Sequence, residues 1–218
     1  MNRTLKAALV LAGLCSLPSL CFSATTVYDN LITPDPSGRQ YFPTNAPTLE
    51  FGDQITLGGT DRRLSQIDFY YFFSGAAAST QSVTLRLYAN SGINPPVTPF
   101  YTSDLIPLAT GFRDQPIVFT NATLTLPNTF TWTVQFSNLA AGQSGGLLLY
   151  GPPAVGSSFN DFWQKDAAGA WSTRQIAGAP FNDFAARFTA VPEPGVLALG
   201  GLGALLLAGL GRFRKAPR

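Results

Sequence analysis

Few side chains of this chain could do chemistry, because its 218 residues include no histidine and only two cysteines, Cys15 and Cys21. Both cysteines lie in an N-terminal segment that we expect to be removed. Catalytic triads that depend on imidazole, thiol catalysis and Cys/His zinc sites are therefore excluded from the mature chain. Carboxylates, hydroxyls, amines and aromatic rings are the groups that remain.

The tetrapeptide Phe-Asn-Asp-Phe occurs twice, at residues 159–162 and 181–184. Its aspartates, Asp161 and Asp183, are candidate calcium ligands, because hard cations bind several oxygen atoms. Two isolated carboxylates fall short of the spacing of calcium loops, and two strands that begin alike would explain the repeat equally. We favour the second explanation, and we predict neither a bound metal nor another cofactor.

Three aromatic residues, Tyr70, Tyr88 and Trp163, fall outside the alternation that would fill a core, and they are candidate contacts for a glycan. The alternative is a role in packing, since a domain without disulfides needs large side chains in its interior. Paired carboxylates could also hydrolyse glycosides. Surface charge, however, explains all eleven acidic residues between positions 24 and 191.

The elements that would position these side chains are strands. At residues 129–136 large apolar side chains alternate with Thr and Gln, which predicts a strand with one dry and one wet face. Residues 67–73 and 82–89 repeat this period of two. Further strands are predicted at residues 26–31, 50–57, 116–120, 122–126, 146–150 and 184–190.

Turn-rich segments separate the predicted strands, and no segment between residues 24 and 191 has a sustained helical period. Residues 163–175 predict a hairpin that turns at Asp166 to Gly169 and brings Trp163 and Trp171 close together. Many short strands with turns between them predict one all-β ectodomain over residues 24–190, an antiparallel β-sandwich or jelly roll of two packed sheets.

Charge is distributed unevenly along the chain, whose formal net charge is +2. Between positions 24 and 191 there are eight basic and eleven acidic residues, so this region carries a net charge of −3. It has no basic stripe that could neutralise a phosphate backbone. We therefore exclude nucleic acid as a partner.

Residues 1–23 have the pattern of a secretory signal peptide, in which basic residues precede an apolar run. Cys21 and Ser23 supply the small side chains at positions −3 and −1, so we expect the mature chain to begin at Ala24. The Sec translocon and signal peptidase are the partners that such a segment implies. An exported domain with no cysteine left has to be stabilised by packing alone.

Residues 191–218 end the chain in three parts. The first is the tripeptide Pro192, Glu193 and Pro194, which its two prolines hold extended. The second, residues 196–211, is an uncharged run with seven leucines. The third is a basic end formed by Arg212, Arg214, Lys215 and Arg218.

The uncharged run predicts a single C-terminal transmembrane helix. As a helix it would be about 24 Å long, which is short against a hydrocarbon core of about 30 Å. The basic end would stay in the cytoplasm by the positive-inside rule, and the tripeptide would then lie at the outer face of the membrane. A plain membrane anchor with basic flanks is the alternative explanation.

This order of tripeptide, hydrophobic segment and basic end resembles the PEP-CTERM sorting signal of Gram-negative bacteria, and the resemblance covers residues 191–218. It implies that exosortase, an integral-membrane processing enzyme, recognises Pro192, Glu193 and Pro194. It also implies an inner-membrane intermediate and delivery to the cell surface or the extracellular space. Such proteins often occur in bacteria that make exopolysaccharide and biofilm matrix, which makes exopolysaccharide a candidate partner.

Together these observations predict an exported, non-enzymatic protein of the cell surface or extracellular matrix. The alternative is a carbohydrate-binding module on the cell surface, which would use the aromatic residues. A carboxylate-based glycoside hydrolase is the third hypothesis.

Overall fold

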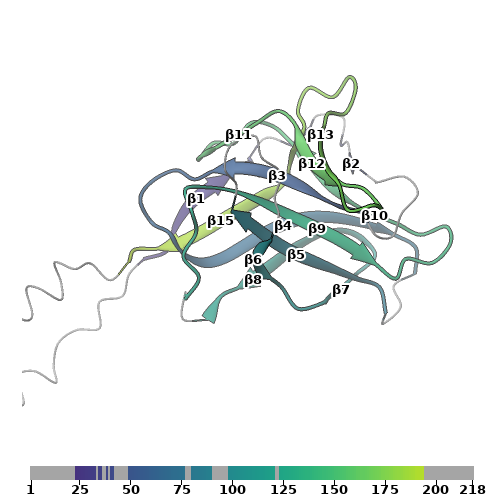
Figure 1. The fold of residues 1–218 in the computed structure, drawn as a ribbon, viewed down its shortest axis with the longest axis horizontal. Helices are drawn as coiled ribbons and strands as arrows, with labels where there is room; N and C mark the ends of the chain where they lie inside the picture. Colours follow the sequence, from purple (N-terminus) through teal and green to yellow (C-terminus); the bar gives the residue numbers. More distant parts are fainter. Residues whose placement is uncertain are drawn as a thin grey trace, which may run out of the picture.

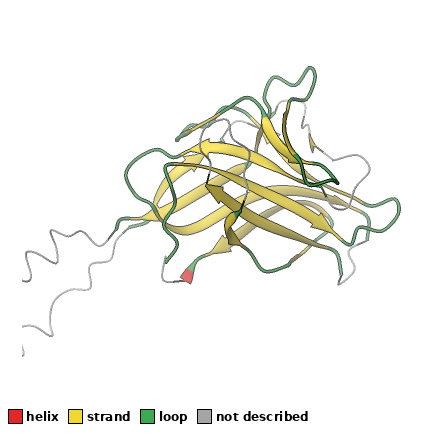
Figure 2. Cartoon of the chain, viewed as in Figure 1, coloured by secondary structure: helices red, strands yellow, loops and turns green. Residues whose placement is uncertain are grey.

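The computed structural model describes residues 23–32, 34–35, 38, 40–41, 49–76, 80–89, 98–120 and 123–193. These residues form two sheets in which every strand pairing is antiparallel (Figure 1). Figure 2 shows that strands and their connecting loops make up nearly all of this part of the chain. The predicted all-β class is confirmed.

The seven-stranded sheet has the order β1-β15-β4-β10-β14, with β2 beside β10 and β8 beside β4. Its strands are β1 (Thr25–Asp29), β2 (Gln40–Tyr41), β4 (Arg63–Ser74), β8 (Gly111–Val118), β10 (Ser144–Tyr150), β14 (Asp183–Phe184) and β15 (Ala186–Val191).

The eight-stranded sheet has the order β13-β12-β3-β9-β5-β6, with β11 beside β3 and β7 beside β5. Its strands are β3 (Glu50–Thr56), β5 (Ser82–Ala89), β6 (Pro99–Thr102), β7 (Ile106–Pro107), β9 (Thr129–Ser137), β11 (Ser157–Ser158), β12 (Phe162–Lys165) and β13 (Trp171–Arg174).

The core lies between the inner faces of the two sheets, where the period of two residues buries alternate side chains. Trp132 of β9 and Phe69 of β4 are both fully buried, and their ring centroids are 6.4 Å apart. Phe51 of β3 and Phe184 of β14 make a second contact between the sheets at 5.5 Å. Because the body has no cysteine, this burial of large apolar side chains is its main source of stability.

The strands predicted at 116–120 and 122–126 both differ from the structure. The strand predicted at 116–120 is the end of β8, which begins earlier, at Gly111. The strand predicted at 122–126 is not formed among the described residues of that segment, where Thr125 makes only an isolated bridge with Arg63. Leu126 is nevertheless buried, so its apolar character reflects core packing and not a strand.

The strand predicted at 184–190 is broken at Ala185, where β14 lies beside β10 and β15 lies beside β4. The fully buried side chain of Asn30 spans this break. Its Nδ2 donates to the carbonyl of Phe184 at 2.9 Å, and its Oδ1 accepts from the amide of Ala186 at 2.8 Å. An amide side chain therefore satisfies two buried backbone groups at the break, as burial requires.

The eight-stranded sheet curls toward its outer face. In the strand order β13 and β5 are four steps apart, which would be about 19 Å in a flat sheet with its spacing of about 4.8 Å. The rings of Trp171 on β13 and Tyr88 on β5 nevertheless have centroids only 5.6 Å apart. Strands β13 and β5 have therefore come closer together than in a flat sheet, and the outer face between them is concave.

Gly52 lies in the middle of β3 and marks a close approach of the backbone within this sheet. A Cβ atom at this position would lie 2.0 Å from the carbonyl oxygen of Trp132 on β9, so only glycine fits. On the concave outer face of this sheet, the outward-facing Thr131 and Thr133 are fully buried. The wet face predicted for residues 129–136 is therefore wrong at these two positions.

The two ends of the body lie together, because Thr25 of β1 pairs with Ala190 of β15 (Figure 1). Most of the predicted signal peptide, Pro194 and the basic end lie outside the described residues. The described residues contain no helix with the length and apolar character needed to cross a membrane, and the span predicted at 196–211 is not among them.

We predict that Asn30→Ala destabilises the body, because it leaves the Phe184 carbonyl and the Ala186 amide buried without a partner. At about 1–3 kcal/mol for each of the two unsatisfied groups, the free energy of unfolding should fall by about 2–6 kcal/mol. Urea denaturation followed by tryptophan fluorescence measures the change. As a control, Gln115→Ala removes an amide that donates to the neighbouring Pro116 carbonyl, and it should have little effect. An equal effect of both substitutions would contradict the role of Asn30.

Candidate functional site

The concave outer face of the eight-stranded sheet holds a polar pocket of about 370 Å³. Strands β3, β5, β6, β9 and β12 contribute to it, and the turn between β12 and β13 closes one side. The residues that line it are Glu50, Arg86, Tyr88, Pro99, Gln135, Lys165, Asp166, Ala167 and Gly169.

Glu50 is the buried acid of this pocket, with a side chain only 5% exposed. Its Oε1 accepts hydrogen bonds from the hydroxyls of Tyr88 and Thr133, both at 2.6 Å. Its Oε2 faces the guanidinium of Arg86 at 3.4 Å and the ammonium of Lys165 at 3.9 Å. Both oxygens of this carboxylate are therefore engaged, as a buried charge requires.

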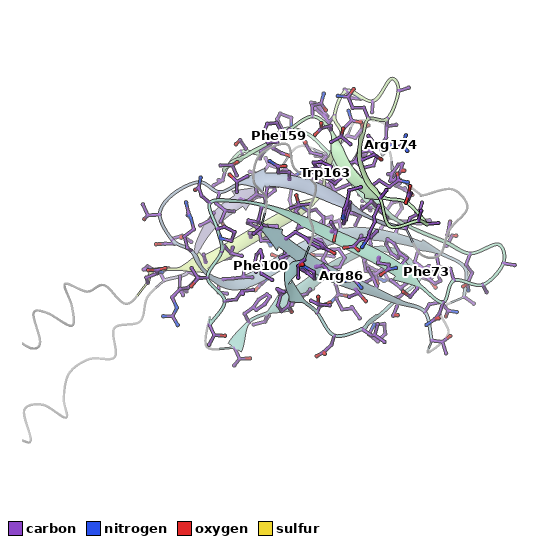
Figure 3. All side chains as sticks on the ribbon, in the orientation of Figure 1. Phe73, Arg86, Phe100, Phe159, Trp163 and Arg174 are labelled. Atoms are coloured by element: carbon purple, nitrogen blue, oxygen red, sulfur yellow. The ribbon has the colours of Figure 1, made fainter. Side chains whose placement is uncertain are left out.

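The two cations reach the pocket from opposite sides of Glu50. Arg86 extends from β5, and it also donates to Oε1 of Gln135 at 2.9 Å (Figure 3). Lys165 extends from β12, and its ammonium lies 5.5 Å from the centre of the Trp171 ring. Their side chains are 22% and 35% exposed, so both remain open to the pocket.

The hairpin predicted at residues 163–175 is confirmed by the pairing of β12 with β13. Asp166 stabilises its turn, because its Oδ1 accepts from the amides of Ala168 and Ala170 at 2.9 and 2.8 Å. Gly169 provides the positive φ of 89° that this turn needs. Lys165 pairs with Trp171.

The three predicted glycan contacts do not come together. Tyr70 lies on β4 of the other sheet, where its ring is 5.9 Å from that of Tyr150. Tyr88 and Trp163 do point away from the core, but they are only 2% and 7% exposed. The curl of the sheet covers them, so neither offers a free ring face. Trp171, half-buried beside Tyr88, is the more open aromatic residue here.

Sequence reasoning did not identify the charged and polar residues that line this pocket. Arg86 and Gln135 occupy outward-facing positions of two correctly predicted strands, and Glu50 begins a third. Alternation could therefore place each of them on an outer face. It could not show that β12 would pair with β3 and place Lys165 directly opposite Glu50.

The two Phe-Asn-Asp-Phe segments meet in the structure. Oδ1 of Asn160 accepts from the backbone amide of Asn182 at 2.8 Å and from its Nδ2 at 3.0 Å. Phe162 and Phe184 also pack together, with ring centroids 5.1 Å apart. The repeat therefore links a strand of one sheet to a strand of the other, which is a packing role.

Asp161 and Asp183 lie in this linked region, near the fully buried Asp53 of β3. Across the described residues, no three His, Cys, Asp or Glu side chains come close enough together to hold a metal ion. Asp53 instead accepts a hydrogen bond from the backbone amide of Phe184, which ties the two sheets together. Burial, and then the neighbouring Asp183, raise the pKa of Asp53 well above its ordinary value.

The predicted sorting tripeptide begins directly after β15. Pro192 is half-buried, Glu193 is exposed, and Pro194 lies outside the described residues together with Arg212, Arg214, Lys215 and Arg218. The first two residues of the tripeptide are therefore at the surface of the body.

Comparisons of this chain with protein-family models, with curated proteins and with solved structures found no match.

We predict that Glu50→Ala destabilises the body by about 3 kcal/mol or more, because breaking a buried charge pair typically costs about 3–5 kcal/mol. The hydroxyls of Tyr88 and Thr133 would lose their acceptor, and Arg86 would lose its counter-charge. Chemical denaturation measures the loss, with the exposed Asp104→Ala as the matched acidic control. Equal stability of the two variants would show that the carboxylate does not organise this face.

We also predict that stability falls as the pH rises from about 4 to about 6. Burial raises the pKa of Asp183 to about 6, so the folded chain holds a proton that the unfolded chain has released. At about 1.4 kcal/mol per pH unit, the free energy of unfolding should decrease by about 3 kcal/mol over this range. Asp183→Asn should make the dependence shallower, and Asp104→Asn should leave it unchanged. The buried Asp53, whose pKa is also raised, accounts for the slope that remains. A slope in Asp183→Asn as steep as in the wild type would contradict this assignment.

Proposed function

We propose that this chain is an exported, non-enzymatic protein of the bacterial cell surface or extracellular matrix. Its body, residues 24–190, would be a β-sandwich of jelly-roll type. A signal peptide at residues 1–23 would direct it through the Sec translocon, and signal peptidase would remove that segment. The PEP-CTERM-like signal at residues 191–218 would place it in the inner membrane through one transmembrane helix until exosortase processes it.

The observation that carries this proposal is the pairing of Thr25 with Ala190. The predicted mature start, Ala24, is one residue before β1, and Pro192 is the first residue after β15. Both predicted processing sites therefore lie next to the same pair of strand ends, and Ala24 and Glu193 are exposed. Such an arrangement would present both sites to enzymes of one membrane without unfolding the body.

The state of the pocket carboxylates supports a non-enzymatic role. Both oxygens of Glu50 are engaged by hydroxyls and cations, and Oδ1 of Asp166 accepts two amides of its own turn. Glycoside hydrolysis requires one carboxyl that donates a proton and a second that acts as base or nucleophile. Neither Glu50 nor Asp166 is free to act as the acid, the base or the nucleophile, so the hydrolase is the least supported hypothesis.

A carbohydrate-binding module is the second candidate function. It is favoured by the polar pocket on the concave sheet face, which combines charged groups and an amide. In binding pockets a few placed polar groups of this kind fix the orientation of the ligand. This function is compatible with the first, since a surface protein that binds exopolysaccharide would be held in the matrix.

We predict that the full chain, produced in a bacterium that has exosortase, yields a mature species that begins at Ala24 and has lost the residues after the tripeptide. Intact-mass measurement and cell fractionation test this. Replacing Pro192, Glu193 and Pro194 together with alanine should leave an uncleaved form in the inner membrane, and Asp104→Ala should be processed normally. An uncleaved wild-type tail would favour a plain membrane anchor, and a full-length cytosolic protein would overturn export.

A further inference from the structure

We infer that the pocket between Glu50, Arg86 and Lys165 binds one neutral sugar unit of a polysaccharide, through adjacent hydroxyl groups on the sugar ring. This deepens the second candidate function and rests on it. Access to such a polymer outside the cell also depends on the proposed export. The size, charge and donor set of the pocket each point to this class of ligand.

The size of the pocket favours a short ligand. At about 370 Å³ it is near the lower end of the range of about 300–1,000 Å³ that is typical of small-molecule sites. The turn at Ala167 and Gly169 bounds one side, and Pro99 of β6 lines the pocket as well. A terminal or side-chain sugar would fit between these walls, whereas a long stretch of polymer would need an open groove.

The charge of the pocket favours a neutral ligand. The acidic residues Glu50 and Asp166 balance the basic residues Arg86 and Lys165, so the lining has no net charge. A sugar carboxylate or a phosphate would meet the two cations, but it would also meet the buried charge of Glu50. Like charges at such distances disfavour binding. A ligand that carries no charge avoids this penalty.

The polar atoms of the pocket suit a ring with adjacent hydroxyls, since a hydroxyl both donates and accepts hydrogen bonds. Arg86 holds several donors in a fixed fork and is anchored by Glu50 and by Gln135. Lys165 provides further donors from the opposite side. These groups are positioned before any ligand arrives, which reduces the entropy cost of binding.

Two packed aromatic residues support the polar groups of the site. The hydroxyl of Tyr88 is fixed on Glu50 at 2.6 Å. Trp171 packs edge-on against Tyr88 with an interplanar angle of 78° and holds that ring in place. Tyr88 is only 2% exposed and offers no free ring face, so the sugar is bound through its hydroxyls and not by stacking.

The test uses the full chain in detergent, immobilised for biolayer interferometry, with dextran and galactomannan as neutral probes and alginate and polygalacturonate as acidic ones. We expect binding to at least one neutral polymer and to neither acidic polymer. Arg86→Gln should weaken that binding at least tenfold. Arg113→Gln, an exposed arginine on β8 of the other sheet, is the matched control and should bind like the wild type.

A second variant guards against loss of fold. Ala167 is exposed in the turn, so Ala167→Leu narrows the pocket without removing any of the contacts of Glu50, and it should also weaken binding at least tenfold. Circular dichroism of both variants checks folding. Unchanged binding by Ala167→Leu, binding to acidic polymers alone, or no binding to any probe would overturn the inference. Fractionation tests export separately, so an exported chain that binds none of the four polymers would refute only this inference.

Discussion

The buried carboxylate of Glu50 organises one whole face of this protein. It lies on β3 and contacts four side chains of neighbouring strands. These are Tyr88 and Arg86 on β5, Thr133 on β9 and Lys165 on β12. A charge that is only 5% exposed is stable only when such partners surround it. β9 and β12 are the neighbours of β3, and the curl of the eight-stranded sheet brings β5, two steps away, within reach of Glu50 as well.

A second set of side-chain hydrogen bonds lies inside the body, which contains no cysteine. Asp53 reaches from β3 to the backbone amide of Phe184 in the other sheet, and Asn30 spans the break between β14 and β15. Both side chains are fully buried. The hydrophobic core supplies most of the stability. These two residues fix the path of the chain at Ala185, between β14, which pairs with β10, and β15, which pairs with β4.

The aromatic residues illustrate how burial depends on shape as well as on strand period. Alternation correctly predicts that Tyr88 and Trp163 point away from the core. In a flat sheet both rings would have been exposed, but here the curl of the sheet leaves Tyr88 only 2% and Trp163 only 7% exposed. Tyr88 therefore contributes a fixed hydroxyl, and Trp171 packs against its ring. The same curl that buries these rings creates the pocket beside them.

The sequence by itself determined the all-β class, most strand positions, the hairpin at Asp166 to Gly169 and the absence of imidazole chemistry, because these depend on local period, turn residues and composition. The predicted sorting signal at residues 191–218, which stays a prediction, also depends on a contiguous pattern. Only the tertiary structure decided that Glu50, Arg86 and Lys165 meet, that Asn160 bonds Asn182 and that Ala185 interrupts a strand. Such contacts join residues far apart in the chain, and they follow from how strands pair, twist and curl, which a period of two residues does not encode.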